Sequence, residues 1–223
     1  RVLIDSTSNG IQGGVSVIKG HYPAPTMKGA INPEDGQLYV TGFSLWGTNT
    51  STISAFTRMR YTGKESLLPE SFAVRNGGIM LRFNVELDGE AVKDISSYKV
   101  KRWNYQRTEK YGSGHYKPDG SVGEENLPVL GAYLSDDSKA LFLAVPNIAE
   151  VMQMEVSYNL KTADGVALED AFWFTVNEVT EPELTAEGFN SLTKEDLVFD
   201  YDPSLMAADS DERPTSELGE ELF

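Results

Sequence analysis

One short stretch of the chain, residues 102–116 with the sequence RWNYQRTEKYGSGHY, concentrates side chains that could take part in binding. Aromatic residues with a polar tip, together with arginine, dominate the cores of protein interfaces and also form platforms that bind sugars. The stretch therefore predicts contact with a partner protein or with a ligand such as a carbohydrate. The candidate contact residues are Trp103, Tyr105, Arg107, Tyr111, His115 and Tyr116.

Two other interpretations of this stretch remain open. Trp103 and Tyr105 could face the core of a β-sandwich, with the remainder forming an ordered hairpin loop. His115 could also be an axial ligand of haem or copper, because imidazole suits both metals. Exposure of the aromatic rings separates the alternatives, since a sugar platform needs exposed coplanar rings and a docking surface needs rings that another protein covers.

Residues for catalysis are scarce in the rest of the sequence. The chain has no cysteine and only two histidines, His21 and His115, which lie far apart in the sequence. Without cysteine the chain cannot form a thiolate metal site. Two remote histidines also do not supply the residues of a histidine zinc site or a hydrolytic triad. Neither a Gly-x-Ser-x-Gly motif nor a phosphate-binding glycine loop is present. We therefore assign no catalytic residue and no metal ligand, and we leave open whether the chain belongs to an enzyme.

The charge of the chain is strongly acidic and unevenly distributed. The net charge is −15, and residues 177–223 hold fourteen acidic residues against Lys194 and Arg213. Binding to a nucleic-acid backbone needs clustered Lys and Arg, so this composition argues against a nucleic-acid partner. No run of eighteen apolar residues occurs, so the sequence predicts no membrane span.

The first part of the chain reads as β-structure. Strands are predicted at residues 15–19, 37–43 and 55–63, and Asp35-Gly36 is a turn signal before the second of them. One small sheet of this size leaves apolar surface and open edges, so it needs neighbours. We expect residues 1–63 to form this unit and residues 64–76 to form a connector with a short strand.

The second part, residues 77–180, predicts an antiparallel β-sandwich without a convincing helix. Strands are expected at 77–87, 98–107, 131–135, 140–145, 152–161 and 171–176. Turns are expected at Asp136-Asp137-Ser138 and at Asp164-Gly165. Residues 181–223 are predicted to be an acidic, mostly irregular linker that ends in the start of a helix. The predicted fold class is all-β.

The first part resembles the last blade of a β-propeller of the glucose/sorbosone dehydrogenase-like group. Such blades have an Asp-Gly turn before a Leu-Tyr-Val strand, and a closing strand that ends in Arg-x-Arg-Tyr-x-Gly. The matching residues here are Asp35, Gly36, Leu38, Tyr39, Val40, Arg58, Arg60, Tyr61 and Gly63. The resemblance implies an incomplete blade in residues 1–63.

The middle part is similar to bacterial Ig-like modules, through an ordered succession of strand motifs. The matching residues are Phe83, Leu87, Asp88, Tyr98, Val100, Leu141, Leu143, Phe174 and Val176. The end of the chain, GEELF, resembles the first helix of a small c-type cytochrome domain through Gly219, Leu222 and Phe223. The Cys and His that attach haem are absent here, so the resemblance implies a c-type haem downstream of Phe223 and no cofactor within the chain.

Together these resemblances imply a non-catalytic structural and docking section of a secreted bacterial electron-transfer protein. Its partners would be the remainder of its own propeller and a downstream or separate cytochrome domain, in the periplasm or outside the cell. The alternative is an accessory β-sandwich module that binds carbohydrate.

Overall fold

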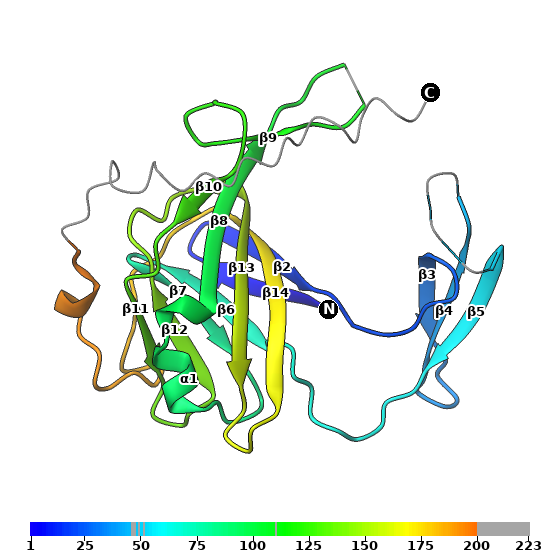
Figure 1. The fold of residues 1–223 in the computed structure, drawn as a ribbon, viewed down its shortest axis with the longest axis horizontal. Helices are drawn as coiled ribbons and strands as arrows, with labels where there is room; N and C mark the ends of the chain where they lie inside the picture. The colour runs from blue at the N-terminus through cyan, green and yellow to red at the C-terminus, as the bar shows by residue number, and fades with distance from the viewer. Residues whose placement is uncertain (46–47, 49, 51, 110, 200–223) are drawn as a thin grey trace. The chain divides into compact units, whose positions relative to one another are not determined.

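The computed structural model describes residues 1–45, 48, 50, 52–109 and 111–199, and these form an all-β protein (Figure 1). The chain divides into two compact units. One unit contains Arg1–Val17 and the described residues from Ser66 onward, and the other contains Ile18–Glu65. Both units are built from antiparallel sheets, so the prediction of an all-β chain is confirmed.

The larger unit contains a seven-stranded antiparallel sheet with the strand order β1-β2-β14-β13-β8-β10, and β9 pairs with β8. The two longest strands, β13 and β14, lie side by side in its middle (Figure 1). The strands are β1 (Val2–Thr7), β2 (Gly10–Ser16), β8 (Tyr98–Tyr105), β9 (His115–Tyr116), β10 (Glu125–Leu127), β13 (Val151–Lys161) and β14 (Ala167–Val176).

A second, four-stranded antiparallel sheet of this unit has the order β11-β12-β7-β6. Its strands are β6 (Ser71–Arg75), β7 (Gly78–Arg82), β11 (Gly131–Leu134) and β12 (Ala140–Ala144). The predicted turn at Asp136-Asp137-Ser138 connects β11 to β12, and Ser138 has a φ of 59° there. The predicted turn at Asp164-Gly165 connects β13 to β14 in the other sheet.

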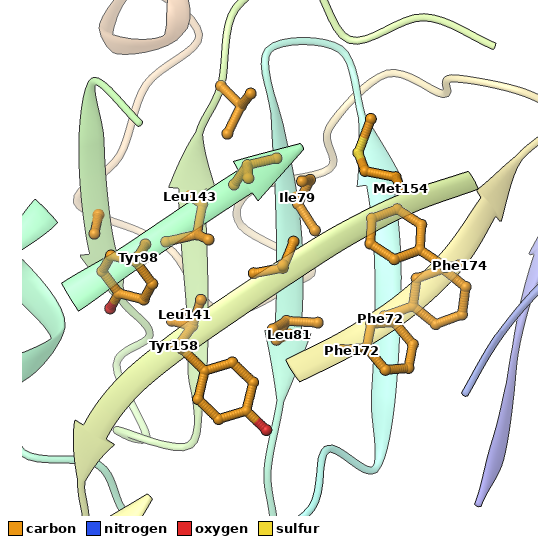
Figure 2. Close-up of a cluster of buried hydrophobic side chains, with 14 of the residues drawn as sticks. Phe72, Ile79, Leu81, Tyr98, Leu141, Leu143, Met154, Tyr158, Phe172 and Phe174 are labelled. Atoms are coloured by element: carbon orange, nitrogen blue, oxygen red, sulfur yellow. The ribbon is translucent and has the colours of Figure 1, made fainter. Parts of the chain in front are cut away.

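The two sheets share one hydrophobic core, which makes this unit sandwich-like (Figure 2). Phe72 of β6 lies against Phe172 and Phe174 of β14, with ring centroids 4.9 and 5.3 Å apart. Met154 of β13 and Leu81 of β7 are fully buried in the same cluster. Alternation along each strand supplies these inward side chains, because successive residues of a strand point to opposite faces.

Two features of this unit correct the predicted boundaries. The short strand expected in the connector at 64–76 is present as β6, but its Phe72 and Val74 are buried core residues, so the four-stranded sheet begins before residue 77. The first seventeen residues also belong to this unit and not to the small sheet, because β2 pairs with β14 through Val15 and Trp173. Strand pairing between residues so distant in sequence cannot be predicted from a local sequence pattern.

A short helix, α1 (Gly89–Lys93), and a 3-10 turn, η1 (Ile95–Ser97), precede β8 where no helix was predicted. Asp88 caps α1 by accepting a hydrogen bond of 2.8 Å from the Ala91 amide. Tyr98 then donates its hydroxyl to the carbonyl of Val92 at 2.8 Å. A polar cap and one buried residue, Val92, are enough for a single turn, which is too short to show apolar periodicity.

The segment 181–199, which was predicted to be a linker, packs against the outer face of the four-stranded sheet. It is irregular except for the 3-10 turn η2 (Glu195–Leu197), in agreement with the prediction of irregular structure. A second apolar cluster forms between this segment and β12: Leu184, Phe189, Leu192 and Leu197 with Ala140, Phe142 and Ala144. The predicted helix start at the end of the chain lies outside the described residues.

The smaller unit is a three-stranded antiparallel sheet with the order β3-β4-β5. Its strands are β3 (Thr26–Ile31), β4 (Leu38–Phe43) and β5 (Ser54–Met59). The predicted turn at Asp35-Gly36 connects β3 to β4, and Gly36 adopts a φ of 66°, which glycine accepts without strain. Among the described hydrophobic residues of this unit, only Ala24 and Val40 are buried.

Candidate functional site

Strand β8 presents the start of the 102–116 stretch on the side of the sheet away from the core. Tyr98 and Val100 belong to the core cluster, so the alternation of the strand places Lys101, Trp103 and Tyr105 on the opposite face. Trp103 is nevertheless only 4% exposed. Other side chains on the outer face must therefore cover it.

His115 is one of the residues that cover Trp103. Strand β9 pairs with the end of β8, which places His115 opposite Tyr105. The His115 ring stacks on the Trp103 indole with centroids 4.6 Å apart and an interplanar angle of 20°. It also meets the Tyr105 ring edge-on at 5.6 Å. The 102–116 hairpin thus folds back on its own strand.

A charged network continues from this aromatic cluster. The Lys101 ammonium lies 2.8 Å from Glu124 Oε2 and 3.4 Å from Glu155 Oε2, and it also lies 5.6 Å from the centroid of the Trp103 ring. His115 Nδ1 is 2.6 Å from Glu124 Oε1. On β14, which pairs with β13, Trp173 donates its indole N–H to Glu155 of β13 at 2.8 Å.

The network shifts the pKa values of two of its members. Partial burial lowers the pKa of Lys101, but hydrogen bonds and charges from Glu124 and Glu155 outweigh that effect and raise it. Burial raises the pKa of Glu124, but hydrogen bonds from Lys101 and His115 outweigh that effect and lower it. Both shifts favour the charged forms, so the network is a set of satisfied ion pairs.

The structure brings together three of the six predicted contact residues, which are Trp103, Tyr105 and His115. Tyr116 is half-buried on β9, where it pairs with Asn104. Arg107 and Tyr111 lie in the loop between β8 and β9 and are exposed. The rings that stack cover one another, so residues 102–116 offer no exposed coplanar set of the kind that a carbohydrate platform needs.

Sequence reasoning missed the polar half of this cluster. Lys101 could have been found from the sequence, because it lies two residues before Trp103 and therefore points to the same face of β8. Glu124 and Glu155 could not have been found in this way, since they reach Lys101 only through the pairing of β8 with β10 and with β13. Trp173 joins the cluster in the same way, because its indole N–H reaches Glu155 through the pairing of β14 with β13.

This cluster is suited to holding the hairpin and less suited to chemistry. Its carboxylates are already engaged by Lys101, His115 and Trp173, and a general acid and base need two groups with separated pKa values. Over the described residues, no group of three or more His, Asp or Glu side chains could hold a metal ion. In the same residues, no helix is long and apolar enough to cross a membrane.

The three-stranded sheet provides the other candidate site, since many of its side chains are exposed. Every residue of β3 is exposed, and Phe56 of β5 is 72% exposed. Large apolar side chains that are exposed on a small sheet, here Met27, Ile31 and Phe56, favour an interaction site. Comparison of the chain with models of protein families, with curated proteins and with solved structures finds no match.

Proposed function

We propose that this chain is a non-catalytic docking section of a larger protein. One observation carries the proposal: the sheet β3-β4-β5 has no core of its own. Met27, Ile31 and Phe56 are 53%, 69% and 72% exposed. Its outer strands, β3 and β5, pair only with β4 among the described residues. Isolated small sheets gain too little burial to be stable, so further protein has to cover this one.

The family resemblance suggests what this further protein is. A blade of the glucose/sorbosone dehydrogenase-like propeller would be completed by the neighbouring blades. The sandwich-like unit would then be an Ig-like spacer that positions a c-type cytochrome domain in a secreted bacterial electron-transfer protein. The motif residues Asp35, Gly36 and Leu38, which lie at a turn followed by a strand, support this assignment.

The first test is the intact mass of the protein purified from its source, together with its visible absorption spectrum. A mass well above the 24.6 kDa of this chain, with the Soret band of a c-type haem, is the expected result. A mass equal to this chain, without haem, would contradict the electron-transfer assignment and leave a free-standing module.

A second test addresses docking itself and needs no cofactor. Amide hydrogen exchange of β3, β4 and β5 should be fast in the isolated chain and slow in the larger protein. The core strand β12 is the internal control, since Leu141 and Leu143 are fully buried and should be protected in both. Equal exchange of β3–β5 in the two samples would refute a docking role for this sheet.

A further inference from the structure

The three-stranded sheet has one face whose side chains are aromatic and cationic. Strand register places Lys28, Thr41 and Phe56 in one row across the sheet and Ala30, Tyr39 and Arg58 in the next. Directly paired residues of an antiparallel sheet share a face. These six residues are named the open face below.

The chain itself partly covers the opposite face. Tyr22 lies against Met59, with its hydroxyl 3.7 Å from the sulfur, and the nearby Ala24 is 3% exposed. The hydroxyl of Thr52 donates to the carbonyl of Pro23 at 3.0 Å and holds this segment in place. Side chains of β5 accordingly alternate between exposed and half-buried, and the exposed Phe56 and Arg58 belong to the open face.

Two aromatic rings form the centre of the open face. Tyr39 and Phe56 stack with centroids 5.5 Å apart and an interplanar angle of 24°. Tyr39 is held by donating its hydroxyl to Asp35 Oδ2 at 2.7 Å. The two stacked rings thus form an apolar patch with Lys28 of β3 on one flank and Arg58 of β5 on the other, and Arg58 also lies near enough to lower the pKa of Asp35.

The charge of this unit is opposite to that of the rest of the chain. Residues 18–65 contain five basic and three acidic residues, a net charge of +2, whereas the whole chain carries −15. The basic residues are Lys19, Lys28, Arg58, Arg60 and Lys64, and the acidic residues are Glu34, Asp35 and Glu65. Positive charge thus coincides with the uncovered sheet, and complementary charge identifies partners.

We propose that the open face binds an acidic polypeptide segment that also carries aliphatic side chains. Carboxylates of the segment pair with Lys28 and Arg58, and its aliphatic side chains cover the Tyr39–Phe56 pair. This inference rests on the proposed docking function and names the chemistry of the partner. Nucleic acid is the less suitable occupant, because two cations on the face neutralise few phosphates and the chain as a whole repels them.

The test is fluorescence anisotropy of a labelled dodecapeptide of alternating glutamate and leucine, titrated with the whole chain. Binding should weaken with added salt, because the ion pairs are exposed. Lys28→Glu and Arg58→Glu should each weaken it by about tenfold. Phe56→Ala should weaken it by a similar factor, about tenfold, with less salt dependence. Circular dichroism establishes that each variant keeps its fold.

Lys64→Glu is the matched control, since it makes the same charge change in the same unit outside the open face, and it should alter binding by less than about twofold. A lysine–leucine dodecapeptide should not bind. Equal binding of that peptide, or tighter binding of a twelve-nucleotide oligothymidylate, would overturn the proposal, as would no binding of the glutamate–leucine peptide.

These outcomes are separable from those that test the docking function. If β3–β5 become protected in the larger protein but the acidic peptide does not bind, docking stands and the assigned partner chemistry is wrong. If the peptide binds while β3–β5 gain no protection in the larger protein, the docking function fails and the open face remains a peptide site. Carbodiimide coupling of Lys28 to a carboxylate in the larger protein would identify the partner residue directly.

Discussion

The four-stranded sheet of the sandwich-like unit and the three-stranded sheet are both built from short strands of four to six residues, yet they differ in what covers them. Phe142 of β12 is fully buried between its sheet and the segment 181–199, whereas Phe56 of β5 is 72% exposed. The sandwich-like unit covers both faces of its four-stranded sheet with its own chain. In the small sheet the chain covers one face only in part, and the proposed partner would cover the other face.

The largest expected effect comes from removing an aromatic ring in each unit. Phe172→Ala should lower the free energy of unfolding of the sandwich-like unit by about 3–5 kcal/mol, because Phe172 is fully buried against Phe72 and Phe174. Phe56→Ala should change it by less than about 0.5 kcal/mol. Urea unfolding, followed by the fluorescence of Trp103 and Trp173, measures both. Similar losses of unfolding free energy for the two variants would contradict the difference in burial between the two units.

A smaller effect is expected from adding one methyl group to a glycine. A Cβ on Gly14 of β2 would lie 2.1 Å from Cζ of Phe172, so Gly14→Ala should cost the sandwich-like unit about 1–3 kcal/mol. Gly13→Ala is the control, because its nearest neighbour, the Leu3 carbonyl, is 3.7 Å away, and it should change stability by less than about 0.5 kcal/mol.

The corresponding glycine of the small sheet sharpens the comparison. A Cβ on Gly42 would lie 1.6 Å from the carbonyl oxygen of Pro25, so Gly42→Ala must displace the segment that covers that face. We expect faster amide exchange around Pro25 and an unchanged urea midpoint of the sandwich-like unit, since Gly42 and Pro25 belong to the other compact unit and are not part of the sandwich-like unit's core cluster. A shift of that midpoint comparable to the Gly14→Ala shift would show that the units unfold together.

The smallest effect concerns pH. Hydrogen bonds from Ser135 and from Arg82 and the Lys139 amide outweigh desolvation and lower the pKa of Asp137 to about 2. Because this value lies below the unfolded value of 3.8, Asp137 stabilises the fold above about pH 4 and loses that contribution as the pH falls toward 2. Asp137→Asn should therefore flatten the dependence of the urea midpoint on pH below 4.

Asp35 in the small sheet provides the comparison for this prediction. Its pKa is also lowered, first by the Gln37 amide and then by the Tyr39 hydroxyl. Asp35→Asn should leave the pH dependence of the sandwich-like unit unchanged, since Asp35 belongs to the other compact unit. An equal flattening by both substitutions would mean that the measured transition is not that of the sandwich-like unit.

Local patterns in the sequence predicted the turns and many of the strands, but they missed β1, β3, β9 and β10, and the strand expected at 77–87 ends at Arg82. The alternation in residues 77–87 correctly placed Ile79 and Leu81 in a core, and the turn residues at 136–138 and 164–165 connect the strands that they were expected to connect. Strand alternation did not reveal that Trp103 is buried on the outer face, because that burial depends on His115 folding back from another strand.

The sequence alone therefore determined the all-β class, the turns and which residues of each strand share a face. These features depend on neighbours a few positions apart. Only the tertiary structure decided that β2 joins β14, that β6 is a core strand and that Phe189 covers β12. Those contacts join residues that are distant in sequence, and their stability comes from apolar area buried together, which no single segment encodes. The covered faces of the sandwich-like unit differ from the open face with Tyr39 and Phe56 in this long-range burial of apolar area.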